Sequence, residues 1–565
     1  MRLLISVAMY LLSLALTLVG IAERTVWAPP QFKAISISIP NTAPLLEIPN
    51  SVLTLHKGKP ILSVQGDGKV YLATGRESDV SAWIAGSSMT NVYFDKSTKK
   101  LASSLVEGIA PSANPTGSDL WRTERTATAK VSAMVDTGSN AAVLLASDGL
   151  AAAPGKLKIE WQRNYDLTPS NVFLYSGLLL MVATLVYNIL VFRNIRNSRR
   201  PRRKLPKAPH GPRSRPKRRE SSLPRRGRRV AGRNYSWIPA SLVMIGLVSG
   251  CAPASSAPIP TPTNKSQIAA KPAALQLGQI RRIVTSVASI AKVSDQTLNS
   301  GQLLSRFAGP ALEMRQAAYS LLKKTQKAPT PDPIYSSPLT LSLPAATDTW
   351  PRTLMVVSGT QKNRLPILLV LRQNDPRSQY LVWYSTTLIS GVKLPAVPAV
   401  NQGSVPVVPS SAYLRELPLN LPNVYGSVID QGSLSPYYPE FDLPGDTFYS
   451  QISKIQKDQL NALTKANLTY QHTLSDPNPL GLSAASGGAL VAVYMKDVTT
   501  IKPTKKNSGI TVNSLEQVAL GAKGSVKGIV STYGDMLLFY VPAVGQSQKI
   551  KLIGWQAGLL TVKSL

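Results

Sequence analysis

The feature that most constrains this chain is a basic tract in its interior. Between Arg193 and Arg233 there are 18 Lys and Arg residues and a single acid, Glu220. The tract supplies half of the formal net charge of +34. It is rich in Pro, Ser and Gly and poor in apolar residues, so it cannot build a packed core. The sequence therefore predicts a disordered loop over residues 193–235, which separates two folded parts of the 565-residue chain.

Two apolar segments precede this loop. Residues 3–22 carry no charge, and 20 residues span a bilayer core of about 30 Å at roughly 1.5 Å per residue. We expect residues 1–22 to be a transmembrane anchor, with a cleaved signal peptide as the alternative. Residues 171–192 are a second apolar segment, and we expect a transmembrane helix there. Because basic loops stay in the cytoplasm, residues 193–235 are predicted to be cytoplasmic and residues 23–170 extracytoplasmic.

A third apolar segment, residues 236–251, ends at Cys251, the only cysteine of the chain. As a helix it would reach only about 24 Å, which is short for a membrane span. Val248-Ser249-Gly250-Cys251 after a basic stretch resembles the lipobox of bacterial lipoproteins. The resemblance implies lipidation of Cys251 and cleavage after Gly250; the alternative is a third span without cleavage. Both place residues 252–565 outside the cytoplasm, with the Ala-, Pro-, Ser- and Thr-rich residues 252–273 as a tether.

Residues 23–170 have the pattern of an all-β extracytoplasmic domain. Residues 35–39 and 156–161 alternate between apolar and polar side chains, as half-buried strands do. Asp67-Gly68 lies between two apolar runs and predicts a hairpin turn, because Gly accepts the positive φ of a tight turn. We expect a small antiparallel sandwich without long helices.

The C-terminal part predicts an α+β fold, with a unit over residues 274–393, a Pro-rich connection over 394–440 and a second unit over 441–565. Helices are expected over residues 275–291, 302–324 and 447–467. Strands are expected over residues 352–357, 365–371, 380–388, 489–495, 526–533, 536–541 and 550–555. Helices followed by an antiparallel meander are similar in order to the curved-sheet cone of the nuclear-transport-factor-2-like fold, here in tandem.

One motif suggests catalysis. Val135-Asp136-Thr137-Gly138-Ser139 resembles the motif of aspartic peptidases, in which two aspartates share a proton and activate a water molecule. The resemblance makes Asp136 a candidate catalytic residue. The chain has no second Asp-Thr-Gly or Asp-Ser-Gly. The alternative interpretation is a turn between two strands, which these residue types favour.

Other site classes find little support in the sequence. The three histidines are isolated, and we expect His56 and His472 to be ordinary surface or capping residues. We therefore predict no metal site and no cofactor. The basic tract lacks interleaved aromatic residues before Tyr235, so we expect it to set topology and contact anionic lipids rather than nucleic acid.

The layout as a whole resembles actinobacterial envelope proteins of the membrane or lipoprotein type. Gly20-Ile-Ala-Glu-Arg-Thr25, the basic tract, the residues before Cys251, Arg352-Thr-Leu-Met-Val-Val357 and Asp375-Pro-Arg-Ser378 carry this resemblance. It implies a protein of the bacterial cell membrane, with membrane lipids and envelope proteins or glycans as partners.

We expect a non-enzymatic protein that displays binding or assembly domains outside the membrane. One alternative is a lipoprotein that binds a small envelope lipid or glycan in a C-terminal cone. The other is an aspartic peptidase that uses Asp136.

Overall fold

The computed structural model describes residues 2–28, 30–40, 43–138, 140–162, 168–198, 271–359, 364–505 and 508–565. Contacts within the chain divide it into two compact units. The first holds two helices, and the second holds the N-terminal strands together with the C-terminal α+β part. The predicted loop over residues 193–235, the segment over 236–251 and the tether lie largely or wholly outside the described residues.

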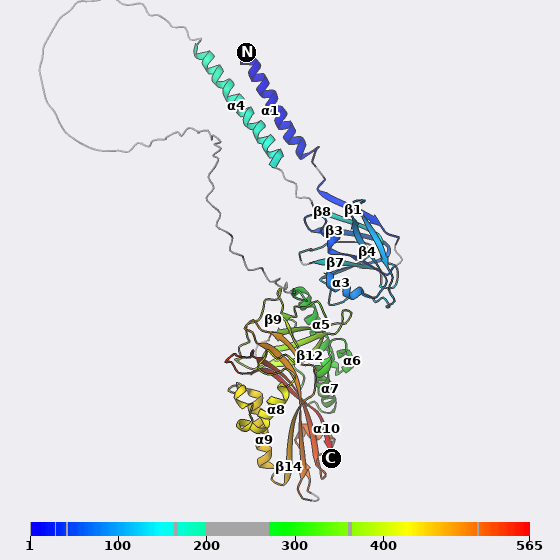
Figure 1. The fold of residues 1–565 in the computed structure, drawn as a ribbon, viewed down its shortest axis with the longest axis vertical. Helices are drawn as coiled ribbons and strands as arrows, with labels where there is room; N and C mark the ends of the chain where they lie inside the picture. The colour runs from blue at the N-terminus through cyan, green and yellow to red at the C-terminus, as the bar shows by residue number, and fades with distance from the viewer. Residues whose placement is uncertain are drawn as a thin grey trace, which may run out of the picture. The chain divides into compact units, whose positions relative to one another are not determined.

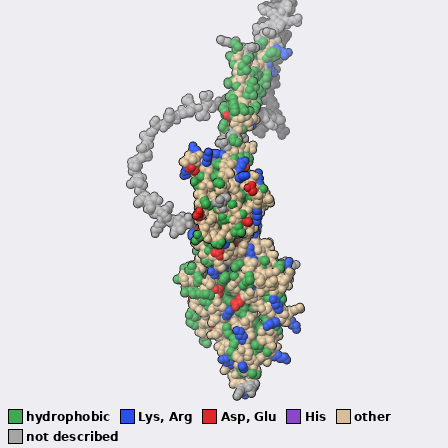
Figure 2. All heavy atoms as spheres, turned by 90° about the vertical axis from the view of Figure 1, so that its right-hand side faces the viewer, with side chains coloured by type: hydrophobic (Ala, Val, Ile, Leu, Met, Phe, Trp, Pro, Cys, Tyr) green, Lys and Arg blue, Asp and Glu red, His purple; other side chains and the backbone are tan. Residues whose placement is uncertain are grey.

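Helices α1 (Arg2–Arg24) and α4 (Thr168–Ser198) form the first unit and lie side by side (Figure 1). Both are long and apolar enough to cross a membrane, as the sequence predicted. Hydrophobic side chains cover the outer surface of the pair that Figure 2 shows. The helices approach closely at Gly177, where an added Cβ would lie 2.8 Å from the Thr17 backbone nitrogen. Small residues permit such packing between apolar helices.

The N-terminal strands form one eight-stranded sheet in the order β1-β8-β3-β7-β2-β4-β5, with β6 also paired to β3. The strands are β1 (Phe32–Ser38), β2 (Leu45–Ile48), β3 (Pro60–Arg76), β4 (Met89–Asp95), β5 (Lys100–Val106), β6 (Thr123–Met134), β7 (Ala141–Ala146) and β8 (Lys156–Gln162). The β character of this region is confirmed. Two short helices, α2 (Asn50–Leu53) and α3 (Glu77–Ile84), accompany the sheet.

The hairpin predicted at Asp67-Gly68 is wrong. Strand β3 continues through this site, and its register with β6 shifts between Gln65 and Lys69. The extra residues form a bulge. Bulges favour glycine, as tight turns do. The two apolar runs are therefore halves of one strand: the first pairs with β8 and the second with β7.

The C-terminal part forms a ten-stranded sheet in the order β13-β15-β16-β19-β20-β12-β11-β10-β9, with β14 also paired to β16. Its strands are β9 (Leu339–Pro344), β10 (Arg352–Ser358), β11 (Ile367–Gln373), β12 (Leu381–Leu388), β13 (Pro406–Val407), β14 (Ala466–Leu474), β15 (Leu480–Ser483), β16 (Ala489–Pro503), β19 (Ile529–Val541) and β20 (Lys551–Ser564). β17 (Ile510–Thr511) and β18 (Gly524–Ser525) form a separate short pair.

Helices cover both faces of this sheet (Figure 1). The helices α5 (Leu277–Thr297), α6 (Ser300–Leu303) and α7 (Gly309–Lys324) lie on one face, whereas α8 (Leu421–Gln431) and α9 (Thr447–Ala462) lie on the other. Helix α10 (Ser514–Leu520) follows β17, and two short 3-10 helices, η1 (Gly432–Leu434) and η2 (Tyr438–Glu440), follow α8. The predicted mixed helix and sheet content is confirmed.

The predicted division into two C-terminal units requires correction. Strand β12 of the first unit pairs with β20 of the second through Thr387 and Leu388, which joins strands of both units into the ten-stranded sheet. The segment predicted as a Pro-rich connection contains α8, whose Val424, Tyr425 and Val428 lie in the core. The two strands expected over residues 526–541 form the single strand β19. The sequence pattern is local and does not reveal pairing between strands that are far apart in the chain.

Candidate functional site

The face of β16 and β19 that looks toward α8 and α9 changes character partway along the strands. On β16, the alternate residues Ala489, Val491, Val493 and Met495 lie in a hydrophobic core. The next residue of that row is Asp497, which is followed by Thr499 and then by apolar Ile501 in another core.

Strand β19 shows the same interruption. Antiparallel pairing places Asp497 opposite Tyr533 and Met495 opposite Asp535, so the two aspartates are diagonal neighbours on one face. We call Asp497, Thr499, Tyr533 and Asp535 the polar floor.

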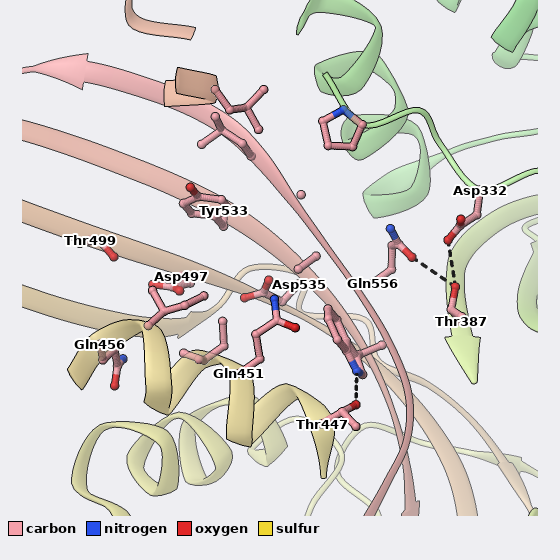
Figure 3. A pocket seen from close by; sticks show the side chains of 18 of the residues that line it. Asp332, Thr387, Thr447, Gln451, Gln456, Asp497, Thr499, Tyr533, Asp535 and Gln556 are labelled. Atoms are coloured by element: carbon pink, nitrogen blue, oxygen red, sulfur yellow. Dashed lines mark hydrogen bonds between the residues drawn. The ribbon is translucent and has the colours of Figure 1, made fainter. Parts of the chain in front are cut away.

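A cavity of about 830 Å³ lies over the polar floor. Helix α9 forms the opposite wall through Gln451, Ile452, Ile455, Gln456 and Gln459 (Figure 3). Further lining residues come from β12, β14, β20, α10 and the loops beside them: Pro329, Asp332, Leu365, Thr387, Leu388, Ile389, Ser390, Thr447, Tyr470, Asn513, Leu515, Glu516, Trp555, Gln556, Ala557, Gly558 and Leu559. The volume lies within the range of about 300–1,000 Å³ that is typical of small-molecule sites.

Asp535 is the most buried acid of the polar floor. Its exposed fraction is 1 %, and its Oδ2 has no hydrogen-bond partner among the described residues. Burial raises the pKa of Asp535 well above its ordinary value, and the negative charge of Asp497 adds to the effect. A buried carboxyl group without a partner carries a large desolvation cost, because neither water nor protein replaces its lost hydrogen bonds.

Asp497 has a buried histidine as its neighbour on the adjacent strand. It lies directly opposite His472 in the pairing of β14 with β16. The His472 Nε2 is 3.7 Å from Asp497 Oδ1, and its Nδ1 is 2.8 Å from Asp430 Oδ1 on α8. Burial raises the pKa of Asp497, His472 opposes that rise, and Asp430 adds to it. The expectation that His472 is an ordinary surface residue is wrong, since its side chain is fully buried between two acids.

The charge of the cavity differs from that of the chain. Among the described residues that line it there are four acids, Asp332, Asp497, Glu516 and Asp535, and no Lys, Arg or His. Figure 3 marks three hydrogen bonds beside the cavity: Thr387 Oγ1 lies 3.0 Å from Asp332 Oδ2 and 3.4 Å from Gln556 Oε1, and Trp555 Nε1 donates to Thr447 Oγ1 at 2.9 Å. The cavity of this basic protein is therefore acidic.

A second group of buried acids lies where the N-terminal sheet contacts the C-terminal part within the second unit. Asp79 on α3 accepts hydrogen bonds from Arg76 at 2.8 and 3.0 Å and from Arg352 at 2.8 Å. Asp119 accepts from two nitrogens of Arg306 at 2.7 and 3.2 Å, and from the Tyr380 backbone N–H. In contrast to the acids of the cavity, these carboxylates are matched by arginines.

Other side chains of the C-terminal part also form hydrogen bonds with the N-terminal part at this inter-domain contact. Arg377 donates to the Trp83 and Pro111 carbonyl oxygens and to Ser87 Oγ, and its guanidinium lies 5.2 Å from the Trp83 ring centre. Gln279 donates to the Leu120 carbonyl oxygen. Arg377 belongs to the Asp375-Pro-Arg-Ser378 segment that the sequence analysis singled out only for its resemblance.

The predicted site residues lie elsewhere. Asp136 occupies the connection between β6 and β7, with 75 % of its side chain exposed and Lys59 Nζ at 3.6 Å. Its Oδ1 accepts a hydrogen bond from the Gly138 N–H, a contact typical of a turn. The proton-sharing pair of an aspartic peptidase needs a second, adjacent carboxyl group, whereas the structure places a lysine beside Asp136. Cys251 lies outside the described residues.

Sequence reasoning missed the residues that line the cavity, although one signal was present. A strand whose buried face reads Val-Val-Met and then Asp-Thr-Ile places polar groups where burial is expected. Such an interruption indicates a functional site when no cation of the protein compensates it.

One comparison with known proteins identifies a family. A family model described as a domain of unknown function, DUF8094, matches residues 272–564, which is slightly more than half of the chain and contains the whole cavity. No curated protein and no solved structure matches the chain. The chain therefore belongs to the DUF8094 family.

Proposed function

We propose that this protein is a membrane-anchored binding protein whose C-terminal domain takes a small amphipathic ligand into the cavity beneath α9. The observation that carries the proposal is the cavity of about 830 Å³ over an uncompensated polar floor. Apolar and aromatic walls with a few convergent polar groups are the usual composition of ligand sites. Among the functions considered from the sequence, we therefore prefer the binding of a small ligand in the C-terminal part.

Two helices that are long and apolar enough to cross a membrane support the proposed anchoring. In this proposal the basic tract is cytoplasmic, both folded parts face outward in a bacterial envelope, and Cys251 carries a lipid. Labelling cells with a fatty-acid analogue tests the lipid: a labelled fragment of the size of residues 251–565 is expected, and Cys251→Ala should abolish it. An unlabelled full-length band would refute lipidation.

The ligand site is tested with environment-sensitive fluorescent probes on the full chain in phosphatidylcholine nanodiscs. We expect neutral dansylamide to gain fluorescence in the cavity. Ile455→Trp should remove the gain, because Ile455 lines the cavity from α9 and the larger indole would take up space that the probe needs. Leu460→Trp is the matched control, since Leu460 lies on the same helix and is exposed but does not line the cavity. Equal effects of the two substitutions would refute the site.

A further inference from the structure

The polar floor and the acids around it indicate the chemical class of the ligand. This inference rests on the proposed function, because it concerns the same cavity. We propose that the cavity recognises a ligand with an organic ammonium group, which lies against Asp535 and Asp497 while its apolar part contacts the walls below α9.

The charge of the lining residues favours a cationic ligand. The chain carries a formal net charge of +34, and basic residues are the commonest charged type available to line any surface. Among the described lining residues there are nevertheless four acids and no base. An anionic ligand would meet these carboxyl groups without a cation to offset them, whereas a cation would find the only complementary charge in the cavity.

Asp535 lacks a hydrogen-bond partner that a ligand could supply. Oδ2 of Asp535 and Oδ1 of Asp497 have no hydrogen-bond partner among the described residues, and both belong to buried side chains on the polar floor. The two aspartates are diagonal neighbours on one face of the sheet, and an ammonium group has three N–H donors, so one such group can donate to both carboxyl groups.

The polar floor favours an organic cation over a metal ion. Within the described part of the chain, no three His, Cys, Asp or Glu side chains come close enough together to hold a metal. Tyr470, Tyr533 and Trp555 line the same cavity, and aromatic rings attract ammonium groups through their negative faces. Leu388, Ile389, Ile452 and Leu559 supply contacts for the apolar remainder of the ligand.

Protonation is consistent with this assignment. Burial raises the pKa of Asp535 well above its ordinary value, so the empty cavity favours the neutral form of this group. A cation brought next to the carboxyl group favours ionisation, so the proton leaves to solvent as the ammonium group binds. The bound state then contains a buried ion pair with hydrogen bonds, which avoids an isolated buried charge.

Three dansyl probes of different charge test the inference on the full chain in phosphatidylcholine nanodiscs: dansylcadaverine with an amine, neutral dansylamide and anionic dansylglycine. We expect dansylcadaverine to bind about tenfold or more tightly than dansylamide, and dansylglycine to bind least. Asp535→Asn should weaken dansylcadaverine about tenfold and leave dansylamide within about twofold, because an amide cannot form the ion pair.

The control is Asp458→Asn, which removes the same charge from an exposed position of α9. It should leave all three probes unchanged. Dansylglycine binding as tightly as dansylcadaverine, or Asp535→Asn leaving dansylcadaverine unaffected, would overturn the ammonium assignment while the cavity remains a binding site. If Ile455→Trp affects no probe, the proposed function itself fails.

Discussion

The two groups of buried acids in this protein have opposite surroundings. At the inter-domain contact, Asp79 and Asp119 are each held by arginine through two or more short hydrogen bonds. At the polar floor, Asp497 and Asp535 have no Lys or Arg among the described lining residues and retain oxygen atoms without hydrogen bonds. Both pairs are well removed from water.

The difference distinguishes buried acids that stabilise the fold from buried acids that we assign to ligand binding. A buried carboxylate with matched guanidinium donors is satisfied within the fold, so removing it leaves buried positive charge behind. A buried carboxyl without donors destabilises the empty protein, and an apolar residue would serve the fold better. We therefore attribute the polar floor to the proposed ligand rather than to packing.

The largest expected effect is at the inter-domain contact. Asp79→Ala leaves Arg76 and Arg352 buried without their shared partner, and Arg352 has an exposed fraction of 0 %. We expect a loss of about 3–5 kcal/mol in the free energy of unfolding, measured by urea denaturation. Asp458→Ala, which breaks an exposed pair with Lys454, should cost less than about 0.5 kcal/mol. Similar losses in the two variants would contradict a structural role for the buried pair.

The second-largest expected effect is the dependence of stability on pH. Here the removal of a buried acid is expected to preserve stability rather than to reduce it. Because the folded-state pKa values of Asp497 and Asp535 are raised, the folded protein binds these protons more tightly than the unfolded chain does. Their contribution to stability is therefore greatest below the unfolded aspartate pKa of about 4 and declines as the pH rises toward the folded values. Each group contributes a decline of up to about 1.4 kcal/mol per pH unit.

Asp535→Asn removes one of these titrating groups. Between pH 5 and pH 7, the variant should lose less stability than the natural protein does. Urea denaturation at each pH measures this loss, over a range that lies within about three units of the ordinary aspartate pKa. Asp458→Asn again serves as control, and its pH profile should parallel that of the natural protein. Parallel profiles for Asp535→Asn would show that this carboxyl group is not held neutral.

The smallest expected effect is at Asp136. Its carboxylate is exposed and its nearest charged partner is an equally accessible lysine, so Asp136→Ala should change stability by less than about 0.5 kcal/mol. We also expect no change in any proteolytic activity of the purified chain toward an unfolded casein substrate. A loss of proteolysis in this variant would revive the peptidase alternative and move the functional site away from the cavity.

Local patterns allowed part of this fold to be predicted. The apolar runs before Glu23 and Arg193 became the helices α1 and α4, because hydrophobic length alone sets the capacity to span a bilayer. Alternation located β1 and β8, and strand-like runs located β10, β11, β12, β16, β19 and β20. The bulge in β3 was missed because Asp67-Gly68 fits either a turn or a bulge, and only the pairing of β3 with β6 distinguishes them.

The candidate site depended on contacts that no local pattern carries. His472, Asp497, Asp535 and Gln456 come from four separate elements, and each looks unremarkable in its own segment. Antiparallel register brings the first three onto one face, and α9 closes over them.

The sequence by itself therefore determined the two membrane-compatible helices, the β character of the N-terminal part and the mixed helix and sheet content of the C-terminal part, since these follow from composition and short-range periodicity. Only the tertiary structure decided that the two expected C-terminal units share one sheet and that acids from distant strands meet without cations. Burial and pairing of charge are properties of neighbours in space, and the chain brings these neighbours together only when the sheet has formed.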